Sequence, residues 1–217
     1  MAKTITVKGV GSVKTKPDYV IISLRLKGED KEYVQAVNKA NEKIALLQKA
    51  IRTVGFSDED LKTLNFSART VYKNVKKVNG YVNVFDGYSV DYQLKLAFDF
   101  TQEKLSETLT AIANSGSDAE FSISFTVKEP EKIANELLIA ATENARQKAE
   151  VLAKASGKTL GELLDIDYYW GSIEVFSHSN YSIAESSDML RAASAVPEFT
   201  PDDIESNDTV TFVWEIV

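Results

Sequence analysis

The segment from Ala140 to Ile166 constrains the fold more than any other, because it joins a long alanine-rich helix to a strand through a glycine. Small and apolar residues recur at three- and four-residue spacing, which predicts a narrow helical stripe made of Ile133, Leu137, Ala140, Ala141, Ala145, Leu152 and Ala155. Pro130 suits the first helical position, and Gly157 suits a left-handed residue after the last turn. We therefore predict a helix from about Pro130 to Ser156 whose small face lies close to its neighbour.

Gly157, Lys158 and Thr159 resemble the end of a phosphate-binding loop. Such a loop needs a strand first, then glycines whose N–H groups face the phosphates, and then a helix. Here the helix comes first, and Leu152 occupies the position of the motif's first glycine. We therefore predict a helix cap at Gly157 and no nucleotide site.

Composition excludes several classes of function. The 217 residues are 44% hydrophobic, which is enough for a sizeable core, and they include no cysteine. Thiol nucleophiles, cysteine-ligated zinc and iron–sulfur clusters are therefore excluded. The net charge of −7 argues against broad contact with nucleic acid or anionic membranes, which need clustered lysines and arginines.

No apolar run in the sequence reaches the length of a signal peptide or of a membrane span. As written, the sequence predicts a soluble, cytoplasmic protein. The alternative is an exported, periplasmic protein from which a signal peptide was removed.

Hydrophobic periodicity predicts an α+β fold of antiparallel β-sheets with packed helices, in the order ββαββαβαββ. Strands are expected near residues 4–13, 20–27, 61–72, 88–98, 121–127, 160–170 and 210–216, and helices near 30–54, 101–114 and 130–156. Asp30 and Thr101 are the expected N-caps of the first two helices. The clearest alternation, from Tyr88 to Phe98, indicates a strand with one buried face. We predict a single domain over residues 1–217, which could divide into two lobes.

Residues 171–208 break this regularity. They include eight serines and two prolines and show no sustained period. Long segments of this kind in compact domains are usually functional or disordered. We interpret the segment as an irregular late loop within the domain, which is either a mobile surface insert or an arm that contacts a partner or another subunit.

Candidate catalytic residues are few. His178 is the only histidine, so no histidine pair can hold a metal, and a Ser-His-Asp triad would depend on this residue alone. Asp165 and Asp167 alternate on one predicted strand, so both carboxylates project from the same face. They are either solvated surface acids or a pair able to do acid–base chemistry.

Two further acidic groups, Asp58-Glu59-Asp60 and Asp202-Asp203 with Glu205, lack the spacing of a calcium loop. We therefore expect no structural ion at either group.

Gly9-Val10-Gly11 lacks the third glycine of a dinucleotide motif and precedes a strand, so it indicates a bulge or a close backbone crossing. Lys73, Lys76 and Lys77 lie before Tyr81 in a predicted hairpin connection. Three lysines are too few for a nucleic-acid site, and we interpret them as a solvated hairpin tip.

Several spaced motifs run along the chain: Ile5-Thr6-Val7 with Gly9, Gly11, Val13, Pro17 and Asp18; Gly55-Phe56 with Asp60-Leu61, Thr63, Asn65 and Phe66; Gly87-Tyr88; Ala145-Arg146, Lys148-Ala149, Leu152-Ala153, Ala155, Gly157, Leu160-Gly161 and Ile166; and Val210 to Trp214. Together they resemble the SIMPL domain family over essentially the whole chain. The sequence departs from the family pattern at Asn114-Ser115-Gly116-Ser117, where the family tends to have a Gly-Ala pair.

The resemblance implies an α+β fold with antiparallel sheets, a tendency to form oligomers and no catalytic residues. Family members are mostly bacterial and often exported to the cell envelope, and some are linked to oxidative-stress defence. These properties are expectations that rest on the resemblance alone.

The sequence therefore predicts a non-enzymatic binding or assembly module, linked through the resemblance to stress defence, with no catalytic, cofactor-binding or metal-binding residues and no cofactor. We expect a homo-oligomer that associates through strand edges, with Val213 and Val217 of the last strand as outward contacts, and a protein partner could bind the late loop. The alternative is a carboxylate-dependent hydrolase or other enzyme that uses Asp165 and Asp167. A deep pocket where these acids converge would favour the enzyme, and a large self-complementary apolar surface would favour assembly.

Overall fold

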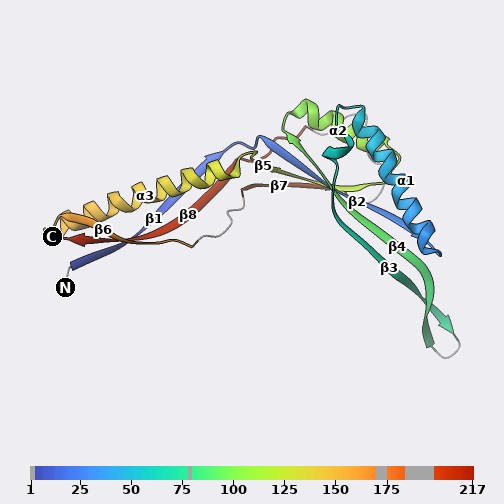
Figure 1. Ribbon diagram of the computed structural model, residues 1–217, viewed down its shortest axis with the longest axis horizontal. Helices are drawn as coiled ribbons and strands as arrows, with labels where there is room; N and C mark the ends of the chain where they lie inside the picture. Colours follow the sequence, from blue (N-terminus) through green and yellow to red (C-terminus); the bar gives the residue numbers. More distant parts are fainter. Residues whose placement is uncertain (1–2, 78–79, 170–174, 184–197) are drawn as a thin grey trace. The chain divides into compact units, whose positions relative to one another are not determined.

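The structure, a computed structural model, describes residues 3–77, 80–169, 175–183 and 198–217. Its antiparallel sheets and helices confirm the predicted α+β fold class (Figure 1). Along the chain the elements are β1 (Lys3–Thr15), β2 (Tyr19–Asp30), α1 (Tyr33–Arg52), a 3-10 helix (Asp58–Asp60), β3 (Lys62–Lys77), β4 (Gly80–Asp99), α2 (Gln102–Asn114), β5 (Glu120–Thr126), α3 (Pro130–Ala155), β6 (Leu160–Asp167), β7 (Phe176–Ile183) and β8 (Ile204–Ile216). Among the described residues, no helix is long and apolar enough to cross a membrane.

The predicted order of helices and strands is correct as far as β6. The prediction that residues 171–208 form an irregular late loop is wrong in part. That segment contains β7 and the start of β8. Sequence periodicity missed β7 because its serines, histidine and asparagine form no pattern, whereas its place at the end of a sheet supplies the pairing. The start of β8 pairs with the end of β1, from Ile204 opposite Thr15 to Asp208 opposite Gly11. Residues 171–174 and 184–197 lie outside the described part of the chain.

The chain forms two compact units. The first comprises Met1–Pro17, Thr126–His178 and Pro201–Val217, and the second comprises Asp18–Phe125 and Ser179–Thr200. The first unit therefore combines strands from both ends of the chain. The assignment of residues 1–217 to a single domain stays a prediction.

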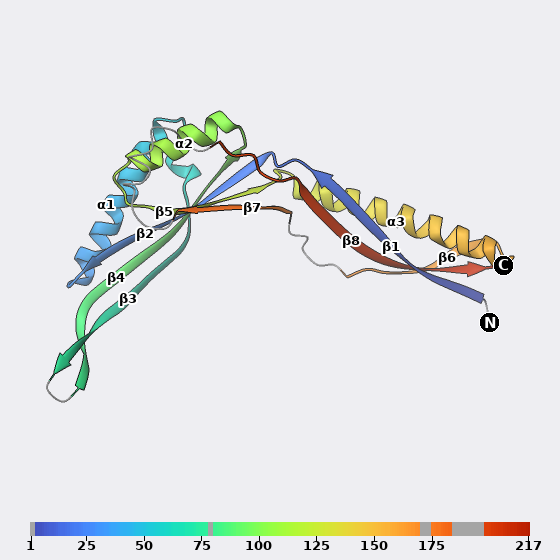
Figure 2. The same cartoon turned by 180° about the vertical axis from the view of Figure 1, so that it is seen from behind.

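In the first unit, α3 covers one face of an antiparallel sheet with the strand order β1-β8-β6 (Figure 2). The alternating residues Val210, Phe212 and Trp214 of β8 are buried beneath the helix. β8 is the central strand: β1 pairs with it from Ile204 to Ile216, and β6 pairs with it from Thr211 to Ile216. The last strand therefore provides no free edge at Val213, whereas association through the outward side chains of Val213 and Val217 stays a prediction.

The buried stripe of α3 repeats at a strict spacing of four residues: Ile133, Leu137, Ala141, Ala145, Ala149 and Ala153. Residues four apart form a single ridge along a helix, and the sheet contacts this ridge. The predicted stripe is correct for Ile133, Leu137, Ala141 and Ala145. It is wrong for Ala140, which is half-buried, and for Leu152 and Ala155, which are exposed. The sequence alone did not show whether successive buried residues of the helix are three or four positions apart.

Gly9 and Gly11 explain why the stripe consists largely of alanines. A Cβ atom at Gly9 would lie 1.9 Å from the carbonyl oxygen of Ala141, and a Cβ atom at Gly11 would lie 2.0 Å from that of Leu137. β1 therefore passes directly beneath the backbone of α3. This confirms the close backbone crossing predicted at Gly9-Val10-Gly11 and the close approach predicted for the small helical face.

Polar side chains of α3 also contact the outer edge of β1. The N–H of Val10 donates to Oδ1 of Asn144 at 3.1 Å, and Nζ of Lys148 donates to the carbonyl of Lys8 at 3.2 Å. These bonds satisfy backbone groups on the side of β1 that does not pair with β8. The helix therefore protects part of this sheet edge.

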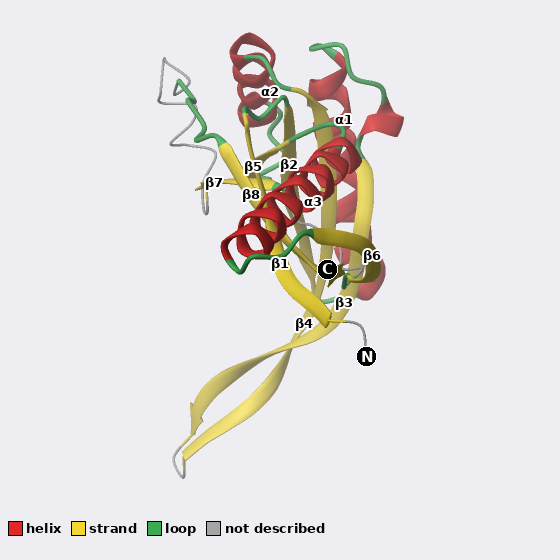
Figure 3. Ribbon diagram, turned by 90° about the vertical axis from the view of Figure 1, so that its left-hand side faces the viewer, coloured by secondary structure: helices red, strands yellow, loops and turns green. Residues whose placement is uncertain are grey.

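In the second unit, α1 and α2 cover one face of a five-stranded sheet with the order β3-β4-β2-β5-β7 (Figure 3). Thr101 is the N-cap of α2, as predicted, because its Oγ1 accepts a hydrogen bond from the N–H of Lys104 at 3.1 Å. The predicted N-cap of α1 is wrong. Asp30 still pairs with Tyr88 as the last residue of β2, and the N-cap position is Glu32, whose side chain makes no capping hydrogen bond.

β3 and β4 form a hairpin that is longer than the rest of the sheet (Figure 3). β2 pairs with residues 88–99 of β4, so residues 80–87 pair with β3 alone. Register shifts occur between Thr63 and Asn65 and between Val71 and Tyr72. The outer part of the hairpin is therefore a two-stranded ribbon.

Candidate functional site

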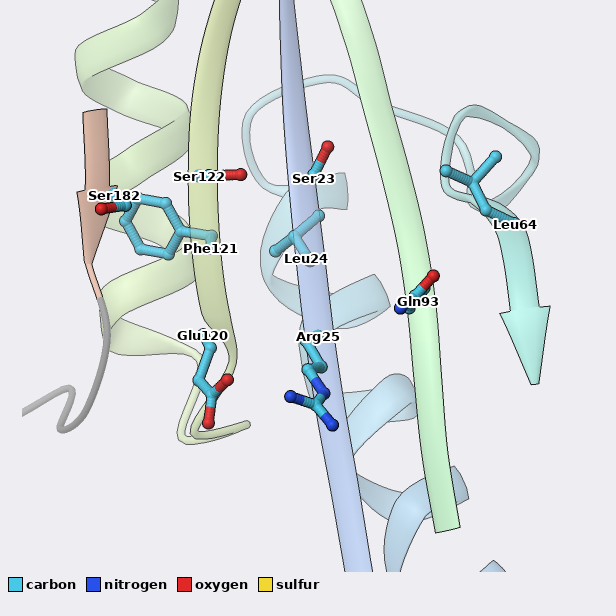
Figure 4. Close-up of a pocket in the computed structure, with 9 residues that line it drawn as sticks. All are labelled: Ser23, Leu24, Arg25, Leu64, Gln93, Glu120, Phe121, Ser122 and Ser182. Atoms are coloured by element: carbon cyan, nitrogen blue, oxygen red, sulfur yellow. The ribbon is translucent and has the colours of Figure 1, made fainter. Parts of the chain in front are cut away.

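The face of the five-stranded sheet opposite α1 and α2 bears a hollow of about 410 Å³ (Figure 4). All five strands contribute to its lining, which consists of Leu64 from β3, Gln93 from β4, Ser23, Leu24 and Arg25 from β2, Glu120, Phe121 and Ser122 from β5, and Ser182 from β7. The alternation of β2 places Ser23 and Arg25 on this face and buries Leu24 in the core. The hollow therefore combines hydroxyl, amide and charged groups.

Opposite charges alternate across the strands that form this face. Both Nε and Nη2 of Arg25 lie 2.7 Å from Oδ1 of Asp91, whose side chain is only 8% exposed. On the other side of β2, Nζ of Lys27 lies 3.2 Å from Oε1 of Glu120. A buried carboxylate such as that of Asp91 is tolerated only when it is paired and hydrogen-bonded. The ion pairs therefore hold the guanidinium and the Glu120 carboxylate in defined positions.

The chemistry of this lining suits binding. Its serines have no histidine beside them, because His178 is the only histidine and is absent from the lining. Among the described residues, no group of three or more histidine, aspartate and glutamate side chains is arranged to hold a metal ion. The hydroxyl, amide and charged groups of the lining can donate and accept hydrogen bonds with a small polar molecule.

The β3–β4 hairpin forms a second candidate site of a different kind. Every residue of β3 is exposed except Val71 and Val75, which are half-buried. The exposed apolar side chains of the hairpin are Leu64, Phe66, Tyr72, Tyr81, Val82, Val84 and Phe85, and their exposed fractions range from 38% to 71%. This concentration of exposed apolar surface is typical of an interaction site.

An aromatic row continues from the hairpin onto α1. The ring centroids of Tyr72 and Phe85 are 6.0 Å apart, those of Phe85 and Tyr88 are 5.4 Å apart, and those of Tyr88 and Tyr33 are 5.8 Å apart. All three contacts are edge-to-face, a favourable geometry for aromatic pairs. The row connects the outer ribbon with the part of the hairpin that pairs with β2.

Asp165 and Asp167 project from the same face of β6, as predicted. Their partners Val213 and Thr211 are alternate residues of β8, on the face away from α3. Both aspartates are exposed, and they do not line the hollow described above. They also do not line a second hollow, in the first unit, whose lining includes Leu160, Leu163 and Phe212. The structure therefore places them in neither of these two hollows.

His178 and the acidic residues near it also lie at the surface. His178 is exposed on β7, and Nζ of Lys14 contacts Asp203 at 3.6 Å and Glu205 at 3.0 Å. The hydrogen bond from Lys14 lowers the pKa of the Glu205 carboxyl, and the charge of His178 adds a smaller effect. Asp203 and Glu205 therefore have a lysine as their counter-ion.

The Asp58-Glu59-Asp60 group has a structural role. Asp58 pairs with Arg52, and Oδ2 of Asp60 accepts from the N–H of Ser57 at 2.7 Å and from its hydroxyl at 2.9 Å. These contacts cap the 3-10 helix and connect it to the end of α1.

The remaining sequence candidates have structural roles as well. The N–H of Lys158 donates to the carbonyl of Ala153 at 2.9 Å, and Gly157 has a φ of +71°, which confirms the predicted helix cap. Lys73 forms an exposed ion pair with Asp86 across the hairpin at 2.5 Å. All three lysines are exposed, which agrees with the interpretation of them as solvated, but they belong to β3 and not to the connection of the hairpin.

Sequence reasoning missed the polar face of the five-stranded sheet. The available signal was the charge of Arg25 and Lys27 at outward positions of one strand and of Asp91 on another. That signal is weak, because solvated strand faces also carry charges. Only the neighbouring positions of β4, β2 and β5 show that these charges form pairs.

Comparison with known proteins identifies the family. The profile of the SIMPL family, described as a protein of unknown function (DUF541), matches residues 5–214. The chain is 28% identical to the 26 kDa periplasmic immunogenic protein of Brucella melitensis over 166 residues, which are 75% of this chain and 65% of that protein. The match thus spans a little under two thirds of the relative's length.

Two solved structures from Listeria innocua, of an uncharacterized conserved protein and of a hydrolase, each align with 96% of this chain and 92% of their own, at 10% identity and a TM-score of 0.19. Scores this low assign neither a fold nor an activity. The family profile, by contrast, covers nearly the whole sequence, and the chain belongs to the SIMPL family of proteins of unknown function.

Proposed function

We propose that this chain is a non-enzymatic assembly module whose copies associate through the β3–β4 hairpin. The observation that supports this most directly is the exposure of β3, a strand of sixteen residues at one end of the sheet order. A strand this long spans roughly 50 Å. Its outer edge has no strand partner among the described residues, so its N–H and C=O groups are a template for pairing with another strand.

The outer ribbon gives a second argument for association. A two-stranded hairpin without a third strand is marginally stable in water. Residues 71–77 and 80–87 form such a ribbon and carry Tyr72, Tyr81 and Phe85 in exposed positions. Contact with a second copy would bury these rings and stabilise the ribbon at the same time.

Location and process are proposed from the relatives. The matched Brucella protein is named as periplasmic, which favours the exported alternative, and nothing in the comparisons supports a cytoplasmic location. A role in stress defence rests on the family resemblance alone. A protein partner of the late loop stays a proposal, since residues 184–197 lie outside the described part of the chain.

A carboxylate-dependent enzyme remains the alternative function. It has less support than assembly, because the exposed Asp165 and Asp167 line neither of the hollows considered above. No other observation on the described residues favours it.

Sedimentation equilibrium over a wide range of protein concentration tests the assembly. We expect an average mass that rises above the monomer mass of 24.0 kDa as concentration increases. The double substitution Tyr72→Ser with Phe85→Ser removes two exposed aromatic rings that contact each other on the hairpin, and it should restore the monomer. A matched control, Val151→Ser with Leu152→Ser, removes two exposed apolar side chains from α3 and should associate like the unmodified chain.

Two outcomes contradict the proposal. A mass of 24.0 kDa at every concentration excludes assembly of this chain. Association that the α3 control weakens as much as the hairpin variant excludes the hairpin as its contact.

A further inference from the structure

The hollow on the five-stranded sheet has features of a prearranged binding site, and Leu64 is the one residue that it shares with the exposed apolar side chains of the hairpin. Asp91 is almost fully buried on a face that neither α1 nor α2 covers, and burying a carboxylate is costly unless a partner compensates it. Arg25 provides this compensation through two N–H groups. The guanidinium is thereby fixed in one orientation without contribution from a ligand.

The rest of the Arg25 guanidinium can bind an anion. A guanidinium carries five N–H donors in one plane. Asp91 accepts through Oδ1 from Nε and Nη2, and no further partner of Arg25 occurs among the described residues. The remaining donors match the two oxygens of a carboxylate. Arg25 lines the hollow, with Ser23 on the same strand (Figure 4).

Glu120 supplies the opposite charge beside it. Lys27 contacts only Oε1 of this carboxylate, and Oε2 has no partner among the described residues. β2 and β5 are neighbours in the sheet, so Arg25 and Glu120 project from strands about 4.8 Å apart (Figure 4). A cation and an anion on neighbouring strands complement a ligand that carries an ammonium and a carboxylate.

Leu64 adds an apolar wall to the hollow. It is the residue skipped in the pairing of β3 with β4, between Thr63 and Asn65, and such bulges redirect side chains next to binding sites. Its side chain is 58% exposed. The hollow thus has an apolar contact on β3, on the far side of Gln93 from Arg25 and Glu120, as a ligand with an aliphatic side chain requires (Figure 4).

We propose that this hollow binds a small zwitterion, an α-amino acid or short peptide, with its carboxylate on Arg25, its ammonium on Glu120 and an apolar side chain against Leu64. The volume of about 410 Å³ accommodates such a molecule. Phosphate compounds fit less well, because Glu120 would repel their charge. The hydroxyls of Ser23 and Ser122 provide further hydrogen bonds to the carboxylate.

Titration followed by nuclear magnetic resonance tests this site with L-leucine as the probe. Saturable shifts are expected at the Arg25 side chain and at the amides of Ser23 and Ser122. Two compounds that each lack one charge separate the contacts. 4-Methylpentanoate has no ammonium and 3-methylbutylamine has no carboxylate, and each should bind at least about tenfold more weakly than leucine.

Variants assign the binding to the two charges. Glu120→Gln should weaken leucine binding by about tenfold, and the same loss is expected for the double substitution Arg25→Gln with Asp91→Asn, which leaves no carboxylate unpaired. Glu150→Gln is the matched control, because it also removes a surface ion pair, with Arg146 at 3.1 Å, and it should leave binding unchanged.

Absence of saturable shifts with leucine and with every other standard L-amino acid at millimolar concentration would overturn the proposal. So would equal binding of leucine and its two analogues, or binding that neither variant weakens. The titration is repeated on the hairpin variant, Tyr72→Ser with Phe85→Ser, which separates loss of assembly from loss of ligand binding.

Discussion

Substitution of Gly9 by alanine tests how closely β1 crosses beneath α3. The new Cβ atom would lie 1.9 Å from the carbonyl oxygen of Ala141, whereas ordinary contact begins at 3.4 Å. The oxygen belongs to the helix backbone and cannot rotate away. The helix or the strand must therefore move by about 1.5 Å, the difference between these two distances.

The cost of this movement follows from the packing around it. Overpacking a tight core typically costs about 1–3 kcal/mol. We expect roughly 3 kcal/mol for Gly9→Ala, at the upper end of this range, because the same shift also separates α3 from Val7, Phe212 and Trp214, which form one buried cluster with its alanines.

Urea denaturation followed by tryptophan fluorescence and circular dichroism measures the loss, since Trp214 lies in the affected cluster. Gly161→Ala is the matched control. It makes the same substitution in the same sheet, but its Cβ would lie 3.2 Å from the nearest atoms, and we expect a loss below about 1 kcal/mol. If Gly9→Ala destabilises the chain no more than Gly161→Ala, the backbone contact between β1 and α3 is wrong.

The remaining predictions concern the second unit. Thr101→Ala removes the N-cap of α2 and should cost about 1 kcal/mol in urea denaturation, whereas Thr110→Ala on the exposed face of the same helix should cost clearly less; equal losses would contradict the capping role. The pKa of Asp58 is lowered by the hydrogen bond from Arg52, and the pKa of Asp60 is lowered by the backbone N–H of Ser57, both from 3.8. Because the folded-state pKa values lie below the unfolded ones, the stabilisation is complete above pH 3.8 and is lost as pH falls through the folded-state values. Unfolding midpoints should therefore drop as the pH falls below 3.8, and Asp60→Asn should show a smaller drop; an equal drop would remove Asp60 from the explanation.

Much of the secondary structure could be predicted from the sequence because its signals are local. Pro130 and Gly157 mark the two ends of α3, and Thr101 marks the start of α2. The alternation in β2, β4 and β8 follows from the opposite directions of successive side chains in a strand. Asp30 misled the prediction because a good capping residue can equally end a strand that has a partner, here Tyr88.

The candidate sites were less accessible to sequence reasoning. Asp165, Asp167 and His178 were candidates because their side chains can do acid–base chemistry, yet the structure leaves all three exposed on β6 and β7. Arg25 and Glu120 are far apart in the chain and lack any motif. Arg25 pairs with Asp91 and Glu120 pairs with Lys27, and both pairs depend on β2 lying between β4 and β5, which no local pattern indicates.

The sequence by itself determined the helices and every strand except β7 and the start of β8, that α3 has a small face, and to which family the chain belongs, because periodicity, caps and spaced motifs are properties of neighbouring residues. The tertiary structure decided that Gly9 and Gly11 lie beneath α3, that β7 forms a strand, and that Asp91 is buried beside Arg25. These features arise from contacts between residues distant in the chain, where pairing and packing outweigh the weak preference of each segment on its own.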